Sequence, residues 1–357
     1  MGSCSHQKNP NLCASWTVMR LPRRSAIALA SAPLHAPLLA FAAAGGGHLP
    51  SSGYPVVKLN DGTAMPALGF GTCCRASAKG KPLIASTKEY LTQGGRLIDT
   101  AQMYENEGAL AEAIRESAVP RSELWLTDKV NTGPWVGDGP VTTRAGAFAS
   151  VEASLKELDT SYLDLMHVHG TWAISPSQQV EVWRGLIDAK AKGLVRRIGV
   201  SNFERAEIEA LAAATGVLPC VHQIEYHPWV PPATFELVRW CQKQQIAITA
   251  YGSLGGSRHK AGESEPSEST NVQSIATTHG CSNAAVLLRW ALNQDVAVIP
   301  GATSAEHIRD NLNVPMFELT ASDRRLLARA RPSTFKRWRN LLEERTCAPS
   351  ASGATCV

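Results

Sequence analysis

Short apolar runs alternate with longer amphipathic segments along most of the chain. Apolar runs bounded by polar residues or glycine are typical of buried β-strands. Such runs occupy residues 68–72, 96–99, 124–129, 163–169, 198–201, 221–225, 246–251 and 296–300. Apolar residues recur at helical spacing in residues 151–158, 179–192, 233–244 and 283–292. The pattern therefore predicts eight strands separated mostly by helices.

A β-hairpin precedes the first of these strands. Residues 56–59 form a short strand that enters the turn at residues 60–63, NDGT. Asp-Gly favours a hairpin turn because glycine tolerates the positive φ angle that the turn requires. The hairpin and the eight strand–helix units that follow it predict a (β/α)8 TIM barrel over residues 54–335.

The main alternative fold is a doubly wound parallel sheet that binds a dinucleotide. That fold needs the glycine-rich fingerprint G-x-G-x-x-G after an early strand. Residues 69–74, GFGTCC, come nearest to it and lack the third glycine. The barrel is therefore the favoured fold.

The first 50 residues have the composition of a targeting leader. They contain no Asp or Glu, and arginines at positions 20, 23 and 24 precede an Ala- and Leu-rich run over residues 25–44. This order fits a secretory signal, a plastid or mitochondrial transit peptide, or a bipartite leader, and the sequence does not separate them. The protein would be cytoplasmic if the leader is not functional. Pro33 and Pro37 interrupt the apolar run, which disfavours stable membrane insertion.

The charge distribution argues against a nucleic-acid partner. The formal net charge is +4, and residues 1–60 contribute +5 with no acid, so the rest of the chain is nearly neutral at −1. A body without a basic face lacks the electrostatic footprint of a DNA- or RNA-binding protein. We therefore expect a monomer that acts on a small molecule.

Cysteine and histidine spacing gives no support for a metal site. The nine cysteines include no C-x-x-C pair, and His167 and His169 are the only close pair of histidines. A metal-dependent hydrolase or lyase is disfavoured for this reason. Cys347 and Cys356 flank the C-terminal tail, residues 336–357, where a disulfide in an oxidising compartment and two free thiols both remain open.

Polar side chains close most of the predicted strands. They are Asp99, Lys129, His169, Ser201, Asn202, Gln223 and Tyr251, and Tyr104 follows Asp99 in the adjoining loop. In a (β/α)8 barrel the carboxyl ends of all strands meet at one mouth, where the active site lies. Each residue alone could be a helix cap or a solvated strand end, but so many together predict a reactive site.

Four of these residues suit the reduction of a carbonyl group. A phenol with a pKa of about 10 is a weak acid, and a nearby ammonium stabilises its phenolate. Lys129 would lower the pKa of Tyr104 in this way, and Asp99 would keep Lys129 charged and oriented. His169 would hydrogen-bond a carbonyl oxygen while Tyr104 donates a proton to the developing alkoxide.

Four longer segments carry a family resemblance. They are residues 95–107, GRLIDTAQMYENE; 193–203, GLVRRIGVSNF; 223–228, QIEYHP; and 250–255, AYGSLG. These segments resemble signatures of the aldo-keto reductases, and the resemblance extends from about Val56 to Leu326. It implies an NAD(P)H-dependent reductase of aldehydes or ketones, with hydride from nicotinamide and a tyrosine as proton donor. A catalytically silent, redox-responsive barrel that binds nicotinamide is the alternative, although such a barrel need not keep all four reactive residues.

The resemblance assigns roles to individual residues. Asp99, Tyr104, Lys129 and His169 take the catalytic tetrad positions, and His169 is favoured over His167 by its spacing from Asp164. The cofactor positions fall on Ser201, Asn202, Gln223, Tyr251, Gly252, Ser253, Leu254, Gly255, Thr303, Ser304, His307, Asp310 and Asn311. Among these, Ser201, Asn202 and Gln223 would hold the carboxamide, Tyr251 would stack on the nicotinamide ring, and the Gly252–Gly255 loop would meet the pyrophosphate.

Several positions depart from the family pattern. Gly301 replaces the usual lysine for the 2′-phosphate and His307 replaces an arginine, so NADPH is favoured over NADH by a small margin only. Gly170 and Cys73 replace two tryptophans that usually line the substrate pocket. We therefore expect a wider and less apolar substrate site.

Overall fold

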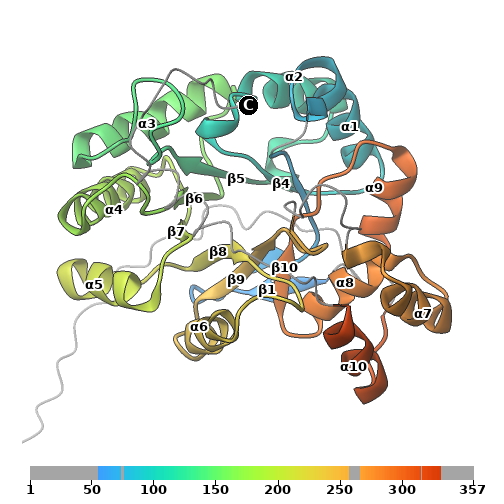
Figure 1. Cartoon of the computed structure of the whole chain (residues 1–357). Coiled ribbons are helices and arrows are strands. Elements are labelled where there is room, and N and C mark those ends of the chain that lie inside the picture. Colours follow the sequence, from blue (N-terminus) through green and yellow to red (C-terminus); the bar gives the residue numbers. More distant parts are fainter. Residues whose placement is uncertain (1–54, 74–75, 257–265, 315, 331–357) are drawn as a thin grey trace, which may run out of the picture. The chain divides into compact units, whose positions relative to one another are not determined.

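Eight parallel strands form one sheet that closes into a barrel (Figure 1). Their order in the sheet is their order in the chain: β3 (Gly69–Gly71), β4 (Leu97–Asp99), β5 (Trp125–Val130), β6 (Leu165–Val168), β7 (Ile198–Ser201), β8 (Val221–Glu225), β9 (Ala247–Tyr251) and β10 (Val296–Val298). Leu68 pairs with Val298, and the Gly71 N–H donates to the Pro300 carbonyl at 3.2 Å, which joins the first strand to the last. The (β/α)8 prediction is confirmed, and the doubly wound sheet is excluded.

The computed structural model describes residues 55–73, 76–256, 266–314 and 316–330, all within the unit formed by residues 47–357. The predicted leader at residues 1–50 and the tail at residues 336–357, with Cys347 and Cys356, lie outside the described residues. No helix among the described residues is long and apolar enough to cross a membrane.

Helices connect the strands and lie around the outside of the sheet (Figure 1). They are α1 (Gly80–Thr92), α2 (Glu107–Ser117), α3 (Arg144–Glu157), α4 (Pro176–Ala191), α5 (Arg205–Thr215), α6 (Pro232–Lys243), α7 (Thr270–His279), α8 (Asn283–Leu292), α9 (Ala305–Leu312) and α10 (Ala321–Arg329). Short 3₁₀ helices occupy Ala76–Ala78, Gln102–Tyr104, Arg121–Glu123 and Pro266–Glu268.

Capping residues explain where two of the predicted helices begin. The periodicity placed one start at residue 151, but α3 begins at Arg144 because the Thr143 side chain accepts a hydrogen bond from the Gly146 N–H. Ser175 and Gln178 form a capping box that starts α4 at Pro176, three residues before the predicted start. Apolar periodicity does not detect such starts, since the first turn of these helices lacks a continuous apolar stripe.

The N-terminal hairpin is present, with β1 (Val56–Lys58) antiparallel to β2 (Ala64–Pro66). Gly62 has the positive φ angle, 83°, that the Asp-Gly turn predicts. Apolar side chains of the hairpin, including Met65, form one buried cluster with Leu97 and Trp125, which lie at the amino ends of β4 and β5. The hairpin therefore covers the amino end of the barrel, and the carboxyl ends of the strands carry the polar residues.

Polar residues also occupy the barrel interior. Lys129 on β5 pairs in register with His167 on β6, which pairs with Gly199 on β7, so all three face the same side of the sheet. A Cβ atom at position 199 would lie 2.7 Å from Cδ2 of His167 and 2.6 Å from the Val221 carbonyl oxygen. Glycine at this position is what makes room for the imidazole.

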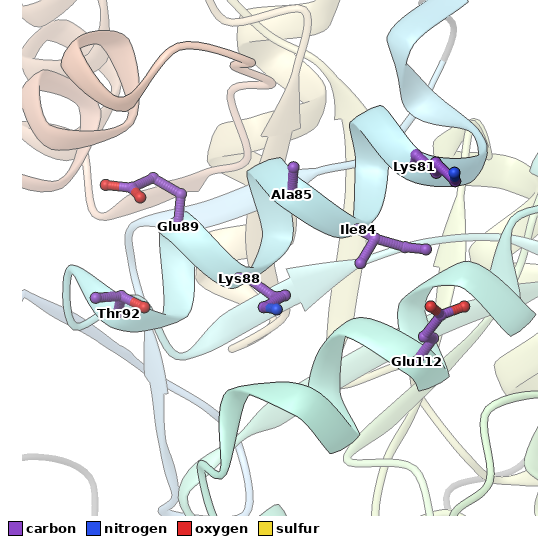
Figure 2. Close-up of a pocket in the computed structure, with 7 residues that line it drawn as sticks. All are labelled: Lys81, Ile84, Ala85, Lys88, Glu89, Thr92 and Glu112. Atoms are coloured by element: carbon purple, nitrogen blue, oxygen red, sulfur yellow. The ribbon is translucent and has the colours of Figure 1, made fainter.

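A surface groove of about 440 Å³ lies between α1 and α2 (Figure 2). It is lined by Lys81, Ile84, Ala85, Lys88, Glu89, Thr92 and Glu112. Lysines and glutamates both line this groove, and Lys88 pairs with Glu116 of α2 at 2.7 Å. The groove is on the outer, helical layer and contains none of the predicted site residues.

Candidate active site

A buried ion pair lies at the centre of the predicted site. Asp99 is the last residue of β4 and Lys129 the last but one of β5. The Lys129 Nζ is 2.6 Å from Asp99 Oδ1 and 2.6 Å from the Thr100 carbonyl oxygen. Gln223 at β8 donates its amide to the other carboxylate oxygen at 2.7 Å. The lysine side chain has no exposed surface. Burial lowers the pKa of Lys129, but the surrounding acidic groups, Asp99 first among them, together outweigh burial and hold that pKa above its usual value.

Tyr104 lies against this lysine. It ends the 3₁₀ helix Gln102–Tyr104, and Glu105 follows in a left-handed conformation with φ of 51° that reverses the chain into α2. The Lys129 Nζ is 5.1 Å from the centroid of the half-buried Tyr104 ring. The Gln102 side chain fixes this turn by donating to the Ser150 carbonyl and the Ser154 hydroxyl of α3.

The pKa of Tyr104 differs from the sequence-based expectation. Burial raises this pKa above the usual 10, and the lowering by Lys129 does not overcome it. The expected net decrease is therefore wrong, because the desolvation of the phenolate raises its pKa more than the nearby ammonium lowers it. Tyr104 consequently keeps its proton throughout the neutral range.

His169 follows β6 and faces the same phenol. The rings of Tyr104 and His169 meet edge to face, with centroids 5.6 Å apart. The His169 backbone N–H donates to the Val130 carbonyl, and its carbonyl accepts from Asn202 Nδ2 at 3.1 Å. Burial and Lys129 lower the pKa of His169 well below 6.5, so its imidazole is neutral at pH 7. His167, the alternative, is fully buried in the barrel beside Gly199.

The predicted nicotinamide residues are connected by hydrogen bonds. The Tyr251 hydroxyl, at the end of β9, donates to Asn202 Oδ1 at 2.7 Å, and Asn202 Nδ2 reaches Ser201 Oγ at 3.0 Å. Ser201 Oγ donates to the Gln223 carbonyl at 2.9 Å. Asn202 has a φ of 58°, an uncommon value for a residue other than glycine, which turns its side chain back between β7 and β9. These four residues and the ion pair therefore form one polar network.

The loop after Tyr251 is compact. The N–H groups of Gly255 and Gly256 both donate to the Gly252 carbonyl, at 3.0 and 2.9 Å. The Gly255 N–H is thus engaged inside the loop. Ser253 is buried and bonds the Ala250 carbonyl, whereas Leu254 packs against the core. Gly252 has a φ of 61°, a conformation that side chains rarely adopt.

The remaining predicted cofactor residues lie on the segment after β10. Ser304 caps α9 by accepting from the His307 N–H at 3.2 Å. Thr303, Ser304 and His307 are exposed, and Asp310 and Asn311 are half-buried. Asp310 pairs with Arg309 at 3.7 Å. These residues therefore form a solvent-facing surface at the carboxyl end of the sheet.

Two tryptophans that were not among the predicted site residues make the substrate side of His169 more aromatic than expected. Trp172 lies 5.3 Å from His169, and Trp135 lies 5.4 Å from Trp172, measured between ring centroids. The absence of aromatic residues at Gly170 and Cys73 therefore does not leave this side of His169 open and polar. Both new rings come from the long loops after β5 and β6, whose conformation apolar periodicity does not encode.

The described parts of the chain contain no set of side chains that could bind a metal ion. No group of three or more His, Cys, Asp or Glu side chains that could hold a metal ion occurs in residues 55–73, 76–256, 266–314 and 316–330.

A model of the aldo/keto reductase family matches residues 68–331. The chain belongs to the aldo/keto reductase family. It is 35% identical to the methylglyoxal reductase DkgB of Escherichia coli over 269 residues, which are 74% of this chain and 92% of that protein. An aldo-keto reductase structure from Brucella melitensis is 31% identical, with a TM-score of 0.67, and the match covers 78% of this chain and 100% of that one. An aldo-keto reductase from Bombyx mori, solved in complex with NADP, is 28% identical, with a TM-score of 0.69 and coverage of 78% and 93%.

Proposed function

We propose that the protein reduces aldehydes or ketones to alcohols, with NADPH as the hydride donor and Tyr104 as the proton donor. The arrangement of Tyr104, Lys129 and His169 carries this proposal. An ammonium 5.1 Å from the centroid of the phenol ring and a neutral imidazole edge to face with that ring suit the reduction of a carbonyl group.

Each member of the tetrad has a separate task in the proposed mechanism. Neutral His169 donates a hydrogen bond to the carbonyl oxygen and orients it. Tyr104, protonated because burial raises its pKa, transfers its proton as the oxygen becomes an alkoxide. Lys129 stabilises the phenolate that remains, and Asp99 at 2.6 Å keeps Lys129 charged and in place.

The residues at the barrel mouth fit a nicotinamide cofactor. Tyr251, half-buried at the end of β9, would stack on the nicotinamide ring, and Ser201, Asn202 and Gln223 would hold the carboxamide. Positive φ angles at Gly252, Gly255 and Gly256 shape the loop after Tyr251, which would run along the pyrophosphate. The bound cofactor would supply the hydride. Thr303, Ser304, His307, Asp310 and Asn311 are proposed to meet its adenosine half.

We propose NADPH as the preferred cofactor, with a small margin over NADH. The Bombyx mori relative was solved with NADP, which supports NADPH here. Gly301 stands where the family has a lysine, and the exposed His307 stands where it has an arginine. The 2′-phosphate would therefore contact fewer permanently charged side chains than in family members that have the lysine and the arginine.

Small carbonyl compounds such as methylglyoxal, the substrate named for the Escherichia coli relative, are the first candidates to test. Purified protein mixed with methylglyoxal should oxidise NADPH, and more slowly NADH, as followed by cofactor absorbance. A panel of aldehydes, ketones and sugars without any cofactor oxidation would refute the proposal.

We further propose that residues 1–50 are a leader that directs the chain to a plastid, a mitochondrion or the secretory pathway, and that the mature protein is a monomer. The acid-free, arginine- and alanine-rich composition supports the leader. A fusion of residues 1–50 to a fluorescent protein tests the destination, and light scattering of the purified barrel tests the oligomeric state.

A further inference from the structure

Two carboxyl groups meet on the outer face of β5, outside the proposed mechanism. Asp128 directly precedes Lys129, so its side chain points away from the barrel interior, and it is fully buried. Glu107 is the first residue of α2 and is half-buried. The two carboxyl groups hydrogen-bond each other, and α3 places the Ser154 hydroxyl close to both.

A hydrogen bond between two carboxyl groups requires that one of them keeps its proton. Asp128 Oδ1 accepts the Lys129 N–H at 2.7 Å. Asp128 Oδ2 and Glu107 Oε1 are buried, and no donor in the described part of the chain reaches either oxygen. A proton shared by the two groups satisfies both oxygens.

The surroundings place this proton on Glu107. Burial, and then Asp128, raise the pKa of Glu107 to about 9. Burial also raises the pKa of Asp128, but the hydrogen bond with Glu107 opposes that increase. Glu157 on α3 adds negative charge beside Glu107, and Lys129 on β5 is paired with Asp99 on the inner side of the sheet. Loss of the proton therefore leaves carboxylates without a compensating cation.

The turn that carries Tyr104 is attached to β5 and α3 at both of its ends. At the first end, Gln102 Oε1 accepts the Asn131 N–H at 2.9 Å, and Gln102 Nε2 donates to Ser154 Oγ at 2.9 Å. At the other end, Glu107 follows Tyr104 by three residues and bonds the residue before Lys129. The 5.1 Å distance from the Lys129 Nζ to the centroid of the Tyr104 ring depends on both attachments.

We infer that Glu107 and Asp128 are positioning residues, whose shared proton holds Tyr104 at its working distance from Lys129. This inference rests on the proposed function. Two carboxylates in contact repel each other, so loss of the proton moves the first turn of α2, and Tyr104 with it, away from β5. Reduction then slows, because Lys129 stabilises the phenolate that remains after proton transfer less well. The carboxyl pair thus limits the reaction at alkaline pH without touching substrate or cofactor.

Single-turnover reduction of methylglyoxal by bound NADPH, followed from pH 7 to pH 10, tests the carboxyl pair. The wild-type rate should fall by about 10-fold per pH unit above pH 9, whereas Glu107→Gln, whose amide cannot lose its proton, should keep its rate to about one pH unit higher. Glu107→Leu has no donor and should be about 10-fold slower than wild type already at pH 7, with an unchanged dissociation constant for NADPH.

Glu116→Gln is the matched control, because Glu116 is an exposed residue of α2 that pairs with Lys88, and its pH profile should equal that of the wild type. A wild-type rate that stays level up to pH 10, or an equal fall in wild type and Glu107→Gln, would overturn the inference. This comparison stands even if Glu107→Leu does not fold.

An NMR titration keeps the inference separate from the proposed function, because it needs no turnover. Tyrosine labelled with ¹³C at Cζ gives a Tyr104 signal that Tyr104→Phe identifies by its loss. This signal should shift with a midpoint at about pH 9 in wild type and Glu116→Gln, and stay in place in Glu107→Gln. Ionisation of Tyr104 itself comes at higher pH, since burial raises its pKa above 10.

The same shift in all three proteins, or none in the wild type, would overturn the inference even if turnover is normal. A wild-type protein without turnover would refute the proposed function, and the NMR titration would still decide whether the carboxyl pair positions Tyr104.

Discussion

Replacing Lys129 with methionine tests the ion pair at the base of the site. Methionine keeps the length of the side chain but removes the ammonium that lies 2.6 Å from Asp99 Oδ1, where the two side chains are 0% and 3% exposed. Removal of one partner from a buried pair costs about 3–5 kcal/mol, because the remaining carboxylate must either stay buried as an unpaired charge or take up a proton. We expect the free energy of unfolding of Lys129→Met at pH 7 to fall by roughly this amount.

The double variant Asp99→Asn/Lys129→Met is the matched control. It removes both charges, and the amide can still bond Gln223, so most of the lost stability should return. Turnover should stay at least about 100-fold below wild type in both variants, since neither can stabilise the phenolate of Tyr104. Stability and activity are thereby separated.

The pH dependence of the single variant has a defined sign. Burial raises the pKa of Asp99 even beside Lys129, and loss of the ammonium raises it further. The folded state then holds a proton that the unfolded state releases, so stability is greatest at low pH and falls by up to about 1.4 kcal/mol per pH unit as pH rises above the unfolded pKa. Urea unfolding between pH 4 and pH 8 measures this slope, which Asp99→Asn should abolish. Equal stability of the single and double variants, or wild-type turnover in either, would refute the reasoning.

Three further predictions concern other parts of the chain. Burial beside Asp128 raises the pKa of Glu107 to about 9, so its contribution to stability is lost as pH rises from the ordinary glutamate pKa to that value; Glu107→Gln should flatten the pH dependence of the urea midpoint between pH 5 and pH 9, and an unchanged slope would refute the raised pKa. Gly301→Lys should tighten NADPH but not NADH, as measured by the dissociation constant of each cofactor, because only NADPH carries a 2′-phosphate that the added ammonium can bind; an equal gain for both cofactors would show that position 301 does not face the phosphate. A chain that begins at Gly53 should remain soluble and active, and loss of soluble protein on this truncation alone would show that the leader packs on the barrel.

Much of the barrel could be predicted because buried parallel strands leave a clear pattern. Strands covered on both faces are nearly continuous apolar runs, and the polar residue that ends each run marks the barrel mouth. Lys129 shows the value of this rule, since a lysine at the end of an apolar run proved fully buried and paired with Asp99 rather than solvated. The hairpin could be predicted from Asp61 and Gly62, because Asp-Gly is a preferred sequence for a hairpin turn.

The rest could not be predicted because it depends on contacts between distant segments. The pKa of Tyr104 is set by how far the site excludes water, which residue types do not reveal. Trp135 and Trp172 meet only because two loops bond each other through Thr132 and Gly170. The repeated Gly-x-Trp spacing was a usable signal for these rings, but its meaning depends on a backbone path that the sequence pattern leaves open.

The proton donor is the central claim, and Tyr104→Phe tests it most directly. Phenylalanine keeps the ring that contacts His169 and Lys129 but has no proton to give. The account predicts that kcat for carbonyl reduction falls by about 100-fold or more while the dissociation constant of NADPH is unchanged. Turnover of Tyr104→Phe within a few-fold of wild type would contradict the account.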